Sequence, residues 1–189
     1  IKEQILVAIK EETQNLFCIG SPLEESTTFG PISSRKQYDR INQYIELGRA
    51  EGATLEHILT AGDMSNVGSF IQPCIFDCAK NSMRIAQEEI FGPVLSVISF
   101  NTDNEAVELA NDVNSGLAAT AWTKDLGRAR SLARDLEVGS VEIRTTTEPA
   151  AALLGLSEEP FGASGFGVVG GLRGLDPYTR LKAVRIITG

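Results

Sequence analysis

The fold class is decided by residues 94–143, VLSVISFNTDNEAVELANDVNSGLAATAWTKDLGRARSLARDLEVGSVEI. It contains three apolar runs of strand length: residues 94–100, 118–122 and 139–143. Between these runs, apolar residues recur at helical spacing in segments that begin after Thr102 and Asp125. Strands that alternate with helices over short loops are typical of a parallel sheet covered on both faces. The sequence therefore predicts an α/β fold with three layers and a mainly parallel, doubly wound sheet.

Two helices are expected before this segment. Apolar residues of the first 16 positions recur at near-helical spacing, which predicts an amphipathic helix that ends before Gly20. A second helix is predicted to begin after Ser34 and to stop near Gly48. Ser34 and Gln37 form a capping-box pattern, in which the glutamine side chain reaches back to the cap.

The remaining segments complete one predicted α/β domain over residues 1–189. Further strands are expected at residues 55–61, 70–76 and 181–187. Helical and strand periodicity is missing from residues 145–176, which are rich in Thr, Ala and Gly and are predicted to be loop. No internal repeat and no linker divides the chain.

Composition and charge exclude some classes of function. Of the 189 residues, 42% are hydrophobic and 22% charged, as in ordinary globular proteins. The formal net charge is −8 without any block of Lys or Arg, which argues against nucleic acid or an anionic membrane as a partner. The 3 cysteines are an odd, sparse set and are interpreted as reduced thiols, so we expect a cytoplasmic protein.

A glycine-rich motif suggests a phosphate site but fails on context. Residues 165–170, GFGVVG, match the G-x-G-x-x-G pattern. That fingerprint needs a strand before it and a helix after it, so that the helix N-terminus meets the pyrophosphate. Gly171, Gly174 and Pro177 leave no useful helix after the motif. We therefore interpret it as a glycine-rich loop.

The cysteines do not suggest a metal site or a nucleophile. Cys74 and Cys78 are spaced as a pair, but a closed zinc site needs four ligands, and the only histidine, His57, lies in a predicted strand. A nucleophilic cysteine would need an electropositive pocket or a histidine partner. We expect small buried hydrophobic residues at both cysteines, no metal, and a structural or solvent-facing His57.

The stretch QEEIFGPVL, residues 87–95, is the candidate for chemistry. It places two carboxylates, an aromatic ring and a Gly-Pro turn directly before an apolar run. A carboxylate beside an exposed ring suits a sugar hydroxyl and a flat heterocycle, as in a nucleotide cofactor. The residues are equally consistent with two solvated acids, Glu88 and Glu89, at the end of a short helix, and with Phe91 as a core ring.

Short motifs along nearly the whole chain resemble the NAD(P)-dependent aldehyde dehydrogenases. They occur in the same order as in that family: GPI at 30–32, FIQPCIF at 70–76, MRIAQEEIFGP at 83–93, NSGLAA at 114–119, WTKD at 122–125, GSV at 139–141, PFG at 160–162, and Tyr178-Thr179 with Lys182 and Val184. Each motif alone is weak, whereas all of them in register are specific. The resemblance is to the C-terminal, catalytic domain of the family, which is an α/β fold.

The resemblance implies roles for three residues. Glu89 would bind hydroxyls of the nicotinamide ribose of NAD or NADP, and Phe91 would pack against the nicotinamide. Phe161 would border the aldehyde pocket, with residues 145–159 as the tunnel-lining loop. Family members are dimers or tetramers, so a homo-oligomer is expected, in which residues 181–187 present an open strand edge.

The sequence departs from the family pattern at groups that the family uses for its reaction. In the family a cysteine attacks the aldehyde, hydride passes to NAD(P), and a water activated by a glutamate hydrolyses the thioester. This chain opens in the helix expected after that cysteine motif, and Cys18 does not match the nucleophile. The dinucleotide-binding domain would also lie upstream. The glycine-rich segment is about three residues shorter than usual and has lost its lysine, and Arg144 replaces a common asparagine.

The preferred hypothesis is the C-terminal portion of an NAD(P)-dependent aldehyde dehydrogenase. The parent protein would oxidise an aldehyde to a carboxylate, while the 189 residues alone would be inactive, hold no catalytic residue and bind NAD(P) very weakly. The alternative is a truncated, non-catalytic binding or assembly homologue. A reductase of acyl phosphates or acyl-CoA ranks last.

Overall fold

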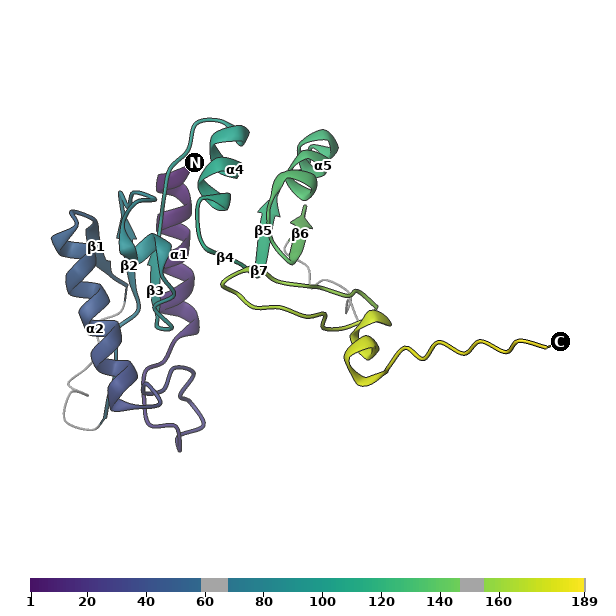
Figure 1. Ribbon diagram of the computed structural model, residues 1–189. Coiled ribbons are helices and arrows are strands. Elements are labelled where there is room, and N and C mark those ends of the chain that lie inside the picture. The colour runs from purple at the N-terminus through teal and green to yellow at the C-terminus, as the bar shows by residue number, and fades with distance from the viewer. Residues whose placement is uncertain (59–67, 147–154, 189) are drawn as a thin grey trace. The chain divides into compact units, whose positions relative to one another are not determined.

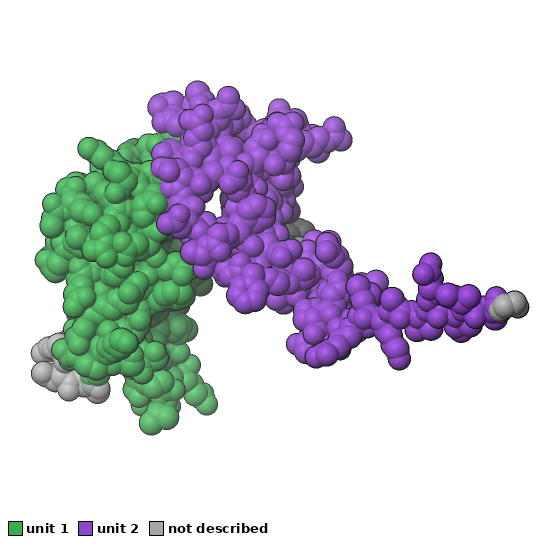
Figure 2. Space-filling view, in the orientation of Figure 1, with its two compact units in different colours: residues 1–100 green, residues 101–189 purple. Residues whose placement is uncertain are grey.

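The computed structural model describes residues 1–58, 68–146 and 155–188, and the chain forms two compact units (Figures 1 and 2). Unit 1 is residues 1–100, with the elements α1 (Lys2–Leu16), α2 (Arg35–Ala50), β1 (Thr54–His57), β2 (Cys74–Asp77), α3 (Arg84–Gln87) and β3 (Val94–Ser96). Unit 2 is residues 101–189, with α4 (Asp103–Asn111), β4 (Ser115–Gly116), β5 (Ala118–Trp122), α5 (Leu126–Asp135), β6 (Ser140–Arg144), β7 (Phe161–Gly162) and a 3₁₀ helix (Arg173–Tyr178).

Three helices begin at the side-chain caps that the sequence predicts. The Ser34 hydroxyl accepts a hydrogen bond from the Gln37 N–H at 3.2 Å. Thr102 caps α4 in the same way, and the Asp125 carboxylate caps α5 by accepting from the Arg128 N–H at 2.7 Å. Each cap satisfies a backbone donor that the first helical turn leaves without an intrahelical partner.

Unit 1 has three layers, with the sheet between α1 and α2. β2 is the central strand: it pairs antiparallel with β1 and parallel with β3. Successive side chains of a strand point to opposite faces. Cys74 and Phe76 accordingly pack in the cluster that contains the α2 residues, while Ile75 packs in the cluster that contains Leu6 of α1. One strand therefore supports both helices.

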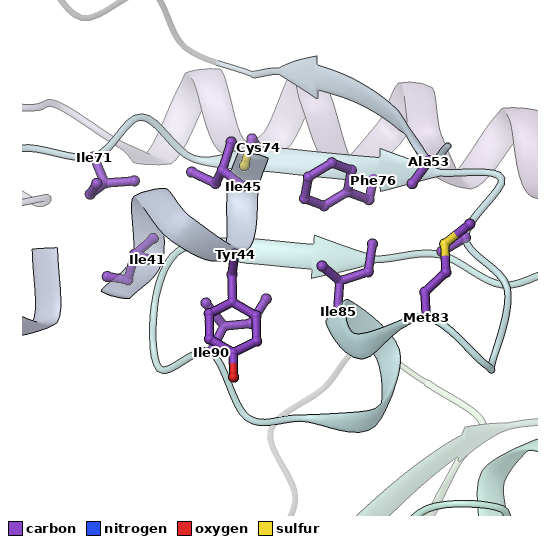
Figure 3. Close-up of a cluster of buried hydrophobic side chains, with 11 residues drawn as sticks. Ile41, Tyr44, Ile45, Ala53, Ile71, Cys74, Phe76, Met83, Ile85 and Ile90 are labelled. Carbon is purple, nitrogen blue, oxygen red and sulfur yellow. The ribbon is translucent and has the colours of Figure 1, made fainter. Parts of the chain in front are cut away.

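The larger core cluster joins α2 to β2 (Figure 3). Of its members, Phe76 and Ile41 are fully buried, and Tyr44 is 6% exposed. Gly48 lets the helix approach the strand, because a Cβ at this position would lie 2.6 Å from the Phe76 ring. Among the described residues, the buried hydrophobic core belongs entirely to unit 1.

Unit 2 contains a strand–helix–strand unit. β5 and β6 pair in parallel over their whole length, from Ala118 opposite Ser140 to Trp122 opposite Arg144, and α5 connects them. A second pair, β4 with β7, is antiparallel. Parallel strands in both units, with helices between strands, confirm the predicted α/β class.

Several predicted strands are shorter in the structure. β3 covers only Val94–Ser96 of the predicted 94–100, the three residues that pair with Cys74, Ile75 and Phe76 of β2. β2 begins at Cys74 rather than at residue 70, and β1 ends at His57. Residues 59–61 of the predicted strand 55–61, and residues 147–154 of the predicted tunnel loop, lie outside the described residues. The predicted loop 145–176 also contains β7 and most of the 3₁₀ helix.

The predicted strand at residues 181–187 is wrong. The segment forms no strand, and Leu181, Val184, Ile186 and Ile187 are each more than 70% exposed. A strand exists only when its backbone groups pair with a neighbour. The apolar residues of this segment therefore predicted a strand that has no pairing partner among the described residues.

In the parts of the chain that the structure describes, none of the helices has both the length and the apolar composition needed to cross a lipid bilayer.

Candidate functional site: the Glu88–Gly92 turn

The turn between α3 and β3 presents Phe91 to solvent. Glu88 ends α3, and the chain then turns through residues 89–92 before β3 begins. Phe91 has a φ of 56°, in the left-handed region that costs a side-chain-bearing residue about 1–2 kcal/mol. Its ring is 71% exposed. The interpretation of Phe91 as a core ring is therefore wrong.

Two side chains of α2 hold the backbone of this turn. The Gln37 Nε2 donates to the carbonyl oxygens of Ile90 and Phe91, both at 2.9 Å. The Arg40 Nη2 donates to the carbonyl oxygen of Glu89 at 2.7 Å. One helix thus holds three successive carbonyl groups of the turn. These hydrogen bonds offset part of the conformational free energy that the positive φ of Phe91 costs.

The capping box at Ser34 is only partly formed, and the predicted bond from the Gln37 side chain back to the cap is wrong. Ser34 accepts from the Gln37 backbone as expected, but the Gln37 side chain does not return to the cap. It reaches a turn that is 53 residues away in sequence, where two backbone acceptors face it. A local motif predicted the position of Gln37 on the helix and missed its long-range partner.

Glu88 is held by an arginine and a tyrosine. The Arg84 guanidinium donates to both carboxylate oxygens of Glu88, from Nε at 2.5 Å and from Nη2 at 2.9 Å. The Tyr44 hydroxyl also donates to the Glu88 carboxylate. These bonds lower the pKa of Glu88 to about 2, with the Arg84 hydrogen bond as the largest cause. The bond to the Glu88 carboxylate also raises the pKa of Tyr44.

The side chains of Glu89 and Phe91 project from the held turn. Glu89 is exposed, and no other described side chain makes a hydrogen bond to its carboxylate. An open hollow of about 250 Å³ adjoins the turn, and its lining includes Glu88, Phe91, Val94 and Ser96. Phe91 lines this hollow and Glu89 does not, but both belong to the same turn: the Glu89 carboxylate can accept hydrogen bonds from hydroxyl groups, and the Phe91 ring offers a flat apolar surface.

The depressed pKa of Glu88 leads to a prediction for acid stability. A carboxylate with a lowered folded-state pKa contributes stability above its ordinary pKa of 4.5, and the contribution is lost as the pH falls toward about 2. We expect Glu88→Gln to be less stable than the parent protein at neutral pH, and the difference to disappear over this interval. Urea denaturation at a series of pH values measures it, with Glu89→Gln as the control for charge removal. A stability difference that is constant with pH would contradict the prediction.

Phe161 lies in unit 2, whereas Glu89 and Phe91 lie in unit 1. It begins β7, opposite Gly116 of β4, and is 48% exposed. The next residue, Gly162, has a φ of 56°, and a Cβ there would lie 2.1 Å from the Asn114 carbonyl oxygen. Glycine at 162 thus allows the β4–β7 pairing that carries Phe161.

The glycine-rich segment 165–170 is a loop, as predicted. Within it, Val169 forms an antiparallel bridge with Glu158. Only the short 3₁₀ helix Arg173–Tyr178 follows, so the helix of a dinucleotide fingerprint is missing from this described region. Arg144, the departure at the end of β6, pairs with Glu142 at 3.1 Å and lies over the Trp122 ring at 5.4 Å.

The cysteines differ from one another in exposure. Cys74 is 1% exposed, and burial raises the pKa of its thiol to about 11, so the reactive thiolate is disfavoured. Cys78 and Cys18 are exposed, so the expectation of a buried Cys78 is wrong. His57 is solvent-facing at the end of β1. The described residues contain no cluster of three or more His, Cys, Asp or Glu suited to a metal ion.

Four residues of the site were missed by sequence reasoning: Gln37 in its actual role, Arg40, Tyr44 and Arg84. The spacing of Arg84 and Glu88 is i,i+4 and is a signal for an ion pair on a helix. Arg40 and Tyr44 carry no such signal toward the turn, because their partners lie 49 and 44 residues further along the chain.

Comparison with known proteins identifies the family. The sequence profile described as "Aldehyde dehydrogenase family" matches residues 1–184. The chain is 40% identical to a betaine aldehyde dehydrogenase of Sinorhizobium fredii over 196 residues, which cover 100% of this chain and 38% of that protein. It therefore spans well under half the length of this relative.

Solved structures give the same result for the fold. A betaine aldehyde dehydrogenase of Staphylococcus aureus, in complex with NAD⁺, has a TM-score of 0.82 and 32% identity, over 94% of this chain and 35% of that one. An indole-3-acetaldehyde dehydrogenase of P. syringae, in complex with NAD⁺ and IAA, has a TM-score of 0.85 and 37% identity, over 96% and 36%. The match over almost all of this chain shows that it belongs to the aldehyde dehydrogenase family.

Proposed function

We propose that these 189 residues are the C-terminal portion of the catalytic domain of an NAD-dependent aldehyde dehydrogenase, and that both units belong to that domain. The observation that carries the proposal is the held turn 88–92, which projects one carboxylate and one ring. The solved relatives named above are NAD⁺ complexes, which supports NAD rather than NADP as the cofactor.

The residues present fit the nicotinamide riboside half of this cofactor. The exposed Glu89 carboxylate can accept hydrogen bonds from two neighbouring ribose hydroxyls. The exposed Phe91 ring offers a face to a planar heterocycle. NAD, when bound, supplies the acceptor for the hydride that leaves the aldehyde carbon. Glu89 and Phe91 bind and orient, and neither carries a proton or a covalent bond in the proposed reaction.

The nucleophile of the proposed reaction lies outside these 189 residues. Cys74 is buried with a raised pKa, Cys18 does not match the family's cysteine motif, and in the described part of the chain the exposed Cys78 makes no hydrogen bond to His57, the only histidine of the sequence. A cysteine thiolate of the full-length protein would add to the aldehyde carbonyl to give a thiohemiacetal, loss of the carbon-bound hydride to NAD would leave a thioester, and water would release the carboxylate and the thiol from it. The 189-residue polypeptide alone should therefore show no turnover and very weak NAD binding. Phe161 would border the aldehyde pocket.

The experiment is an NADH-formation assay on the full-length protein that contains this chain. Betaine aldehyde and indole-3-acetaldehyde, the substrates in the names of the relatives, head a panel of aldehydes. Aldehyde-dependent NADH formation by the full-length protein, and none by the 189-residue polypeptide, is the expected result. A full-length protein that forms no NADH with any aldehyde would contradict the proposal.

A non-catalytic assembly homologue is the second candidate. Arg144, in place of a common asparagine, is tied to Glu142 and Trp122 within unit 2, which suits a structural role at the end of β6. This candidate gains support if the working protein in its source cells has the mass of these residues alone and forms no NADH.

We further propose a homo-oligomer in which residues 181–187 pair with a strand of another subunit. Their exposed apolar side chains support this, because extended apolar chain is stabilised when its backbone groups pair. Sedimentation of the full-length protein should show an oligomer. A monomer at every concentration would refute the proposal.

A further inference from the structure

Tyr44 connects the two sets of bonds that hold the turn. Its hydroxyl donates to the Glu88 carboxylate and accepts from the Arg40 Nη2 at 3.2 Å. The Arg40 guanidinium lies 4.8 Å from the centre of the Tyr44 ring, and that of Arg84 lies 5.7 Å from it. The ring itself belongs to the core and is 6% exposed. A rigid, buried side chain thus anchors both the Glu88 side chain and the arginine that holds the Glu89 carbonyl.

Hydrogen bonds therefore hold the residues on both sides of Glu89, while no described side chain makes a hydrogen bond to the Glu89 carboxylate. On one side, the Glu88 carboxylate accepts hydrogen bonds from Arg84 and Tyr44. The Glu89 carbonyl is held by Arg40, and the two carbonyls after it by Gln37. The Glu88 side chain and the Glu89 carbonyl are thus both held, which restrains the backbone on either side of the Glu89 Cα, while the side-chain torsions of Glu89 remain adjustable.

We infer that Tyr44 and Glu88 are positioning residues for cofactor binding, which act by fixing the direction in which Glu89 and Phe91 project. The inference rests on the proposed function of the turn. Neither residue need touch the cofactor: Tyr44 is buried, and the Glu88 carboxylate is occupied by Arg84 and Tyr44. Small misplacements of a binding group are costly, because hydrogen-bond strength falls steeply with distance and angle.

The test is Tyr44→Phe in the full-length enzyme, with Tyr38→Phe as the matched control. Both tyrosines lie on α2, and both changes remove one hydroxyl, but only the Tyr44 hydroxyl bonds to the turn. We expect Tyr44→Phe to raise the KM for NAD about tenfold and to leave the KM for the aldehyde unchanged. Tyr38→Phe should change either KM by less than about twofold.

A second variant, Glu88→Gln, keeps the test decisive if Tyr44→Phe folds poorly, since the Glu88 side chain is 39% exposed. It should raise the KM for NAD in the same direction, and Glu88→Asp should restore part of the loss. A variant with a lower melting temperature and an unchanged KM for NAD would overturn the inference, as would an equal effect of Tyr38→Phe. A parent enzyme that forms no NADH would overturn the proposed function and this inference together.

Discussion

Replacing Glu89 with alanine in the full-length protein is expected to raise the KM for NAD by roughly 10-fold to 100-fold. A hydrogen bond to a charged group contributes about 1.5–3 kcal/mol, and each 1.4 kcal/mol is about a tenfold change in affinity. Glu89 has no competing hydrogen-bond partner among the described side chains, so the loss should appear almost entirely in cofactor binding. Steady-state kinetics with varied NAD at saturating aldehyde measure it.

The control for this change is Glu12→Ala, which removes an exposed carboxylate of α1 in the same unit. It should leave the KM for NAD within about twofold of the parent value, because surface substitutions away from a site have small effects. Unfolding measurements should show that Glu89→Ala is as stable as the control. An unchanged KM for NAD in Glu89→Ala would exclude Glu89 from the cofactor site.

Phe76→Ala should have the largest effect on stability, with a loss of about 3–5 kcal/mol in the free energy of unfolding. The ring is fully buried in the larger core cluster (Figure 3). Helix α2 packs closely on it at Gly48, where a Cβ would lie 2.6 Å from the ring. Its removal leaves a cavity that a helix and a sheet cannot both collapse to fill. Urea denaturation measures the loss.

Phe100→Ala is the matched control in unit 1, because that ring is 55% exposed. Its free energy of unfolding should change by only about 0.5 kcal/mol. Phe76→Ala should also weaken NAD binding, since the helix that Phe76 supports carries Gln37 and Arg40. Equal stability of the two variants would contradict the assigned core.

Elements with local signals could be predicted from the sequence. Ser34, Thr102 and Asp125 marked helix starts because a cap bonds to a backbone group only three residues away. β5 matched its prediction at both ends, Ala118 and Trp122. The segment 181–187 failed for the converse reason: a strand also needs a partner, and local sequence does not contain one.

The candidate site was only half predictable. Glu89 and Phe91 were found from the order of residue types and from the family resemblance, and they remain proposals. The positive φ of Phe91 and the donors from Gln37, Arg40 and Tyr44 depend on a helix some 50 residues earlier in the chain. Such contacts are set by the packing of α2 on β2, which no local pattern around residue 90 encodes.

The most direct test of the central claim is a crystal structure of the full-length protein with NAD⁺. We predict the Glu89 carboxylate at hydrogen-bond distance, about 2.6–3.2 Å, from the hydroxyls of the nicotinamide ribose, and the Phe91 ring against the nicotinamide. The bonds from Gln37 and Arg40 to the turn should be present as they are here. A cofactor bound elsewhere, with Glu89 and Phe91 in contact only with solvent, would contradict the proposed role of the turn.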